Sequence, residues 1–286
     1  MIEFYLLGDM GSGEEDQFIV AKSLTSHIKN NKKKGLFVCG LGDNIYEEGC
    51  CSVDDKQFDE KFEIPYHDID NNVKFYMCLG NHDYGYDIFD KKGNSVNQIK
   101  YGIESQKKGK KWYMPSSYYT FQKGNIDFFV MDTNFNNLTK EEIENQLKYF
   151  IDKINGSKKK WKILIGHHTL RSVAGHGNAE PPMEDFFHRL LEHCSFDLYF
   201  CGHDHNKQVI NTKINNKDIT CIVCGTGGKT YHKEINLSNV EEGELDFSSP
   251  NLGYGYCKEK KNSLEFDFFD GMNNLEYRYN FTKSKI

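Results

Sequence analysis

Two targeting features are missing from this sequence of 286 residues. No hydrophobic run is long enough to cross a membrane, since a transmembrane helix needs about 20 predominantly apolar residues. At the start, Met1 to Leu7 lead at once into the first polar motif, which leaves no room for the charged region, apolar stretch and cleavage site of a signal peptide. We therefore expect a cytoplasmic protein without a membrane partner, or a secreted or lysosomal one if a leader has been removed.

An excess of positive charge and a disulfide framework are missing as well. The formal net charge is −6, which argues against a nucleic-acid partner. The nine cysteines are odd in number and scattered, so no disulfide pattern is implied. Cys221 and Cys224 form a lone CxxC in an apolar run, and a zinc knuckle would need a second pair. We expect these two thiols to be buried and reduced.

Strand and helix patterns alternate along the front half of the chain. Apolar runs predict strands at 2–8, 36–41, 73–79, 118–122, 126–131, 161–165 and 196–201, and further strands in the tail at 208–214, 219–223, 254–258, 264–269 and 276–281. Helices are expected from Glu14 to Lys29, with Phe18, Ala21, Leu24 and Ile28 on the inner face, from Thr139, and from Pro181. The stretch from Asp87 to Pro115 looks rich in loops. Because no repeat or linker is visible, we predict one domain, residues 1–286, of the α/β class, with two mixed β-sheets packed as a sandwich and flanked by helices.

Five short motifs carry side chains that bind metals, and most of them follow an expected strand. They are Gly8-Asp9-Met10-Gly11, Gly42-Asp43-Asn44-Ile45-Tyr46, Gly80-Asn81-His82-Asp83, Gly166-His167-His168 and Gly202-His203-Asp204-His205. In sheets of parallel strands, sites form beyond the carboxyl ends of the strands. The side chains are too few for two separate closed metal sites, but they suffice for two ions if one aspartate bridges them.

Asp43 is the candidate bridge between the two ions. Asp9, Tyr46 and His205 can complete the shell of the first ion, and Asn81, His167 and His203 that of the second. A phenolate favours ferric iron at the first position, whereas an amide oxygen and two imidazoles suit Fe²⁺, Zn²⁺ or Mn²⁺ at the second. His168 competes with His167 for the ligand role, and we prefer His167 because it directly follows Gly166, as His203 follows Gly202.

The order of these motifs resembles the purple acid phosphatases of the calcineurin-like metallophosphoesterase superfamily, and most of all their small, tartrate-resistant type. The likeness covers nearly the whole chain and includes Met114 to Tyr119 and Val130 to Thr133. It implies metal ligands at Asp9, Asp43, Tyr46, Asn81, His167, His203 and His205, and substrate contacts at His82 and His176. The sequence departs from the pattern at Met10, where an aromatic residue is usual, and at Thr169-Leu170, where a proline is common. Other branches of the superfamily place a histidine two residues after the first aspartate; here that residue is Gly11, and Tyr46 replaces it as ligand.

The predicted function is an acid phosphatase that hydrolyses phosphate monoesters by attack of a metal-bound hydroxide. His82 would donate a proton to the leaving oxygen, Asp83 would orient His82, and His176 would assist. We expect a monomer that acts on a small phosphate ester or a phosphoprotein, with specificity set by the loops Asp87 to Ser95 and Ser172 to Pro182. The alternatives are a phosphodiesterase or nucleotide hydrolase with the same centre, and a catalytically silent scaffold of the same fold.

Overall fold

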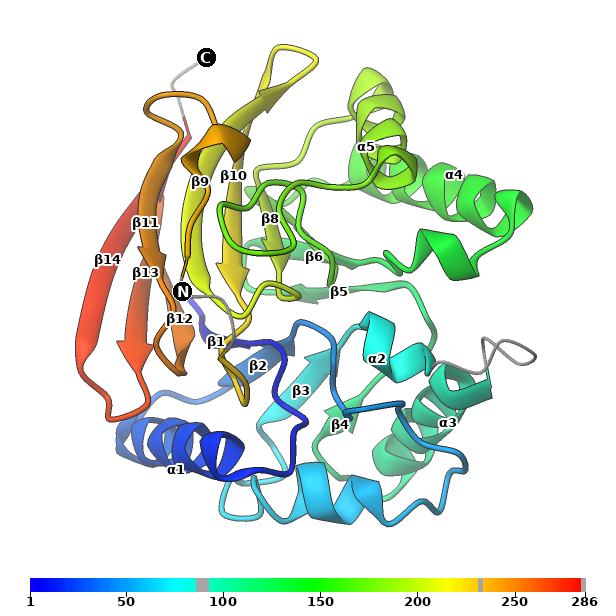
Figure 1. Cartoon of the computed structure of the whole chain (residues 1–286), viewed down its shortest axis with the longest axis vertical. Coiled ribbons are helices and arrows are strands. Elements are labelled where there is room, and N and C mark those ends of the chain that lie inside the picture. The colour runs from blue at the N-terminus through cyan, green and yellow to red at the C-terminus, as the bar shows by residue number, and fades with distance from the viewer. Residues whose placement is uncertain (86–92, 231–233, 284–286) are drawn as a thin grey trace.

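Two β-sheets lie face to face, with helices on both outer sides (Figure 1). The computed structural model describes residues 1–85, 93–230 and 234–283. The first sheet has the order β14-β13-β12-β1-β2-β3-β4, with strands β1 (Glu3–Leu7), β2 (Phe37–Gly40), β3 (Lys74–Met77), β4 (Trp112–Tyr113), β12 (Gly253–Glu259), β13 (Ser263–Asp270) and β14 (Leu275–Thr282). The second has the order β11-β9-β10-β8-β7-β6-β5, with strands β5 (Tyr119–Lys123), β6 (Ile126–Val130), β7 (Trp161–Ile165), β8 (Leu198–Cys201), β9 (Lys207–Ile214), β10 (Lys217–Cys224) and β11 (Leu245–Ser249).

Both sheets are mixed. Strands β1 to β4 are parallel to one another, as are β6, β7, β8 and β10, whereas the outer strands are antiparallel. The predicted sandwich of two mixed sheets is therefore confirmed. That the chain forms a single domain stays a prediction.

Alternating side chains of the central strands fill separate hydrophobic layers. In β1, Phe4 and Leu6 point into the core between the sheets, while Tyr5 and Leu7 point into the layer beneath the helices. Strand β6 follows the same rule on the other side. Because both faces of these strands are buried, their sequences read as continuous apolar runs, which is why they were predictable.

The helices cover the two outer faces. Helix α1 (Glu15–Asn30) and α3 (Gly93–Lys107) pack on the first sheet, and α4 (Lys140–Gly156) and α5 (Pro181–His193) on the second, with the short α2 (Asn81–Tyr84) between them (Figure 1). The predicted capping box starts α4, where the Thr139 hydroxyl accepts a hydrogen bond from the Glu142 amide and the Glu142 carboxylate accepts one from the Thr139 amide. Among the described residues, no helix combines the length and the hydrophobicity that a membrane crossing requires.

The prediction that Phe18 lies on the inner face of α1 is wrong. Its side chain is 41% exposed, and Gln17 takes the inner position instead. The Gln17 side chain accepts a hydrogen bond from the Gly13 amide at Oε1 and donates one from Nε2 to the Lys61 carbonyl. Successive residues of a helix point about 100° apart. With Gln17 on the inner face, the next residue, Phe18, is therefore turned outward.

Helix α3 was also missed, because its inner face is polar and small. The stretch predicted to be rich in loops contains this helix, whose buried residues are Ser95, Gln98, Gly102 and Ser105. A Cβ on Gly102 would lie 2.6 Å from the Met114 carbonyl oxygen, so only glycine permits this packing. Residues 87–92 of the same stretch lie outside the described part of the chain. Elsewhere, Cys221 and Cys224 are buried and free, as expected.

Candidate metal centre

The five predicted motifs meet at one edge of the sandwich. They begin within three residues of the carboxyl ends of β1, β2 and β3 in the first sheet and of β7 and β8 in the second. Backbone hydrogen bonds join the loops pairwise: the Asp9 amide donates to the Gly42 carbonyl (3.0 Å), and the Gly202 amide to the His167 carbonyl (3.0 Å). All seven predicted ligand side chains are thereby brought to one place.

Glycines before the ligands make this convergence possible. A Cβ on Gly80 would lie 2.1 Å from the Asp43 Oδ1 atom, and one on Gly202 would lie 2.5 Å from Asp9 Oδ2. A real side chain at either position would displace a carboxylate supplied by another loop. The recurrent glycine in the motifs is therefore explained by close approach of neighbouring loops.

Three of the candidate ligands adopt the left-handed backbone region. The φ angles are 55° at Asp9, 50° at Asp43 and 69° at His203. This conformation is uncommon for residues other than glycine, costs of order 1–3 kcal/mol each, and concentrates at functional sites. Sharp turns at these positions aim the side chains back across the end of the sheet.

Asp9, Tyr46 and His205 form a triangle of donor atoms. The Tyr46 hydroxyl lies 3.1 Å from Asp9 Oδ1 and 3.1 Å from His205 Nε2, and the last two atoms are 3.4 Å apart. Ligands bound at about 2.1 Å to one ion lie about 3.0–3.4 Å from each other in octahedral or tetrahedral geometry. The three atoms therefore fit around a single cation.

A second group surrounds His167. Its Nε2 atom lies 3.0 Å from Asn81 Oδ1, 3.2 Å from His203 Nδ1 and 3.4 Å from Asp43 Oδ2. The Nδ1 atom donates to the Leu41 carbonyl (2.8 Å), which in the neutral ring leaves the lone pair on Nε2 facing the other ligands. Four acceptor atoms that face one another require a cation or a proton between them. One ligand atom each from Asp43, His167 and His203 lies within 4.8 Å of the others, which is close enough for all three to bind one metal ion.

The ionisation of these side chains fits a cation site. Burial opposes protonation of His167, but the Asp43 carboxylate outweighs it and raises the pKa of His167 to about 9. Burial lowers the pKa of His203 far below its usual range, so this ring is neutral and can offer a lone pair. Burial, with the Asp43 and Asp9 carboxylates, raises the pKa of Tyr46 well above its ordinary value. A phenolate there needs a strongly charged cation to displace its proton. The Asp43 carboxylate lies close enough to both Tyr46 and His167 to raise the pKa of each.

The predicted substrate-contacting histidines flank this cluster. The Nδ1 atom of His82 lies 2.6 Å from the Glu47 carbonyl oxygen and its Nε2 atom lies 4.0 Å from Asp43 Oδ2. The ring of His176 stacks on that of His203 at 3.9 Å, and its amide donates to Asp204. Both rings thus border the space next to the candidate ligands.

Asp83 has a different set of contacts from the one predicted. Its buried carboxylate accepts hydrogen bonds from the amides of Asn44, Ile45 and Gly80 and from the side chain of Gln98. These contacts join the second motif loop to the third. Its predicted role of orienting His82 stays a prediction, whereas the loop-joining role follows from the geometry.

Two neighbours of the ligands were not predicted. The Lys229 ammonium lies 4.5 Å from the centre of the Tyr46 ring and pairs with Glu47 at 2.7 Å. The Thr133 hydroxyl accepts hydrogen bonds from the backbone amides of His167 and His168. Lys229 carries no sequence signal of its own, whereas Thr133 lies in the segment Val130 to Thr133 that shares the family likeness and follows the end of β6.

Two mixed sheets, with two groups of candidate ligands gathered at the strand ends, are the arrangement expected of a metallophosphoesterase. The sequence pattern of the calcineurin-like phosphoesterases matches residues 2–207. The chain therefore belongs to the calcineurin-like phosphoesterase family, and that family implies a dinuclear metal centre.

The relatives agree with the resemblance noted in the sequence. Purple acid phosphatase 7 of Arabidopsis thaliana is 26% identical over 99% of this chain and 86% of its own length. Tartrate-resistant acid phosphatase type 5 of Sus scrofa is 26% identical over 86% of this chain and 76% of its own length. Among solved structures, GAP50, described as the anchor in the inner membrane complex of Plasmodium, matches with a TM-score of 0.80 and 22% identity over 99% of this chain and 89% of that one. The resemblance to purple acid phosphatases is confirmed.

Proposed function

We propose that this protein is a phosphatase with two metal ions that hydrolyses phosphate monoesters under acidic conditions. The observation that carries the proposal is the convergence of the seven candidate ligand side chains into two neighbouring groups, with Asp43 3.4 Å from His167 Nε2 and near enough to Tyr46 to raise its pKa. A bound metal pair would supply Lewis-acid polarisation of the phosphate and a water acidic enough to become the nucleophile. The ferric position would be the one beside Tyr46, and a divalent ion would bind beside His167.

The protein's own residues would hold and protonate the substrate. Asp9, Asp43 and Tyr46 supply the negative charge that two neighbouring cations require. The Nδ1–H group of His82 donates a hydrogen bond to the Glu47 carbonyl, and its Nε2 atom lies 4.0 Å from Asp43 Oδ2. In the protonated ring, Nε2–H can donate to the phosphate or to the leaving oxygen. His176 adds a second ring at the side of His203. The substrate would be a small phosphate ester bound by a monomer.

The test is hydrolysis of a chromogenic aryl phosphate by protein reconstituted with ferric iron and then with Zn²⁺ or Mn²⁺. Asp43→Asn should lower kcat/KM by at least about 100-fold, since loss of a ligand exceeds the effect of losing its supporting groups. Asp218→Asn is the matched control, because that carboxylate is 73% exposed and pairs only loosely, at 3.4 Å, with Lys213. Unchanged activity of Asp43→Asn would exclude the bridging role. A comparison with the corresponding bis-ester separates a monoesterase from a phosphodiesterase.

A silent scaffold is the second candidate, and the likeness to the inner membrane complex anchor is the observation in its favour. The complete set of seven ligand side chains favours the enzyme. Protein that binds two ions yet hydrolyses neither kind of ester would support the scaffold.

A further inference from the structure

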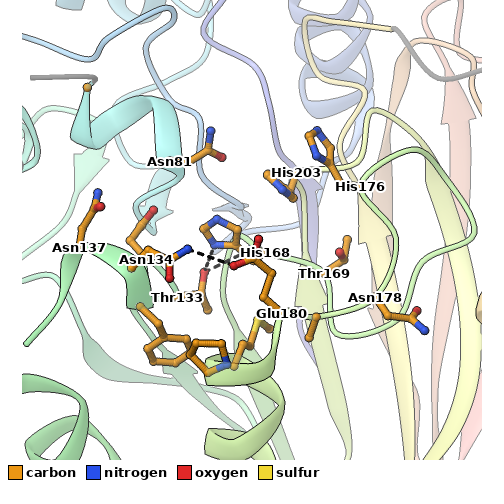
Figure 2. A pocket seen from close by; sticks show the side chains of 16 residues that line it. Asn81, Thr133, Asn134, Asn137, His168, Thr169, His176, Asn178, Glu180 and His203 are labelled. Atoms are coloured by element: carbon orange, nitrogen blue, oxygen red, sulfur yellow. Dashed lines mark hydrogen bonds between the residues drawn. The ribbon is translucent and has the colours of Figure 1, made fainter. Parts of the chain in front are cut away.

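A pocket of about 440 Å³ opens directly beside the second ligand group. Asn81 and His203 line it, and the rings of His168 and His176 lie beside His203 (Figure 2). An ester whose phosphate sits at the candidate metal centre would place its leaving group in this space. The volume lies within the range of sites for small organic ligands.

The rest of the described lining carries no formal charge except for one carboxylate. Amide side chains line it at Asn134, Asn136, Asn137 and Asn178, beside the apolar Phe135 and Met183. Of the described residues that line the pocket, none is lysine or arginine, and Glu180 is the one with a carboxylate. The described lining thus offers acceptors for hydroxyl and ammonium groups, and within it no lysine or arginine is present to bind an anionic group.

Glu180 is held toward the pocket by its neighbours. It stands at the N-cap of α5, where its side chain caps no helix amide. Instead its Oε2 atom accepts a hydrogen bond from the side chain of Asn136 (3.0 Å), another residue of the lining. A neutral amide donor does not neutralise a carboxylate, so the negative charge of Glu180 stays available to a ligand.

From these observations we infer that the pocket is a leaving-group subsite for phosphate monoesters of hydroxyl-rich or ammonium-bearing alcohols, and that Glu180 rejects leaving groups that carry a second negative charge. The inference rests on the proposed function, since it assumes that phosphate binds at the metal centre. Glu180 acts as a specificity-determining residue, and the asparagines orient the hydroxyl groups of the ligand.

The test uses three six-carbon esters that share the phosphate and differ in charge. They are glucosamine 6-phosphate, glucose 6-phosphate and 6-phosphogluconate. Metal-loaded protein should bind the first two more tightly than the third by a factor on the order of ten, which is the effect of one carboxylate near the surface. Binding is measured by calorimetry in the presence of each ester, and turnover is measured separately.

Two variants and one control give the inference its sharpest form. Glu180→Gln should bring the three dissociation constants close together, and Glu180→Lys should make 6-phosphogluconate the preferred ligand. Glu192→Gln, an exposed carboxylate on the same helix that does not line the pocket, should keep the wild-type order. An unchanged order in both Glu180 variants, or no binding of any ester, would overturn the subsite. Ester binding in the predicted order without turnover would instead contradict the proposed function alone.

Discussion

Gly11 offers the most direct mutational test of how the loops build the metal centre. A Cβ at this position would lie 1.8 Å from the Asn44 carbonyl oxygen and 2.6 Å from the Ile45 amide nitrogen. Both are backbone atoms, so no side-chain rotation relieves the overlap, and ordinary contact is about 1.6 Å further away. Gly11→Ala must therefore push the second motif loop outward, between Asp43 and Tyr46.

Gly11→Ala is expected to lower the free energy of unfolding and to release a metal ion. Overpacking of this kind costs about 1–3 kcal/mol of unfolding free energy. The Gly11 amide also donates to the Asp43 carbonyl (3.3 Å), and the Tyr46 amide donates to the Gly11 carbonyl (2.9 Å). A shift of these bonds by about 1 Å exceeds the tolerance of about 0.2 Å in metal–ligand distances, so the ion beside Tyr46 should be lost.

Denaturant titration measures the change in unfolding free energy, and metal analysis after equilibrium dialysis measures the loss of the ion. Gly156→Ala is the control, because nothing lies within 4 Å of its Cβ position at the end of α4. The control should be neutral or gain up to about 1 kcal/mol from helix propensity. The reasoning is refuted if Gly11→Ala retains both ions and the wild-type unfolding free energy.

Three further predictions concern other parts of the chain. Thr139→Ala removes the hydroxyl that accepts the Glu142 amide and should lower the unfolding free energy by about 1 kcal/mol in urea titrations, while Thr139→Ser should not. Burial lowers the pKa of His27 below that of the unfolded chain, so its contribution to stability is complete above about pH 6.5 and is lost as the pH falls. His27→Gln should therefore flatten the fall in unfolding free energy between about pH 6.5 and 5, and an unchanged slope would contradict this. Lys229→Met removes a positive charge 4.5 Å from the centre of the Tyr46 ring, and this loss raises the energy of the phenolate electrons. The visible charge-transfer band of the ferric protein should therefore move to longer wavelength. A band at the wild-type position would count against this prediction.

The convergence of the candidate ligands was predictable because most of their motifs follow a buried strand. An apolar run such as that of β7 identifies the strand. The parallel arrangement places Asp9 and Asp43 at one edge of the first sheet, and His167 and His203 at one edge of the second. The glycines before them added a signal that the structure explains by close approach of the loops. Topology and ligand type were thus both contained in local patterns.

Other features depend on contacts that no local pattern reports. The environment of Asp83 is set by Gln98 on α3, a helix whose polar inner face hid it from periodicity. Lys229 reaches Tyr46 from a loop 183 residues further along the chain, and its position is known only from the fold. The orientation of Glu180 depends on Asn136 in the same way. Tertiary contacts, rather than propensity, decided each of these cases.

Anomalous X-ray diffraction from crystals of the metal-loaded protein tests the central claim most directly. The account predicts two peaks roughly 3.5–4 Å apart, one inside the triangle of Asp9, Tyr46 and His205 and the other beside His167, with the Asp43 carboxylate between them. A single peak, or two peaks without Asp43 in contact with both, would contradict it.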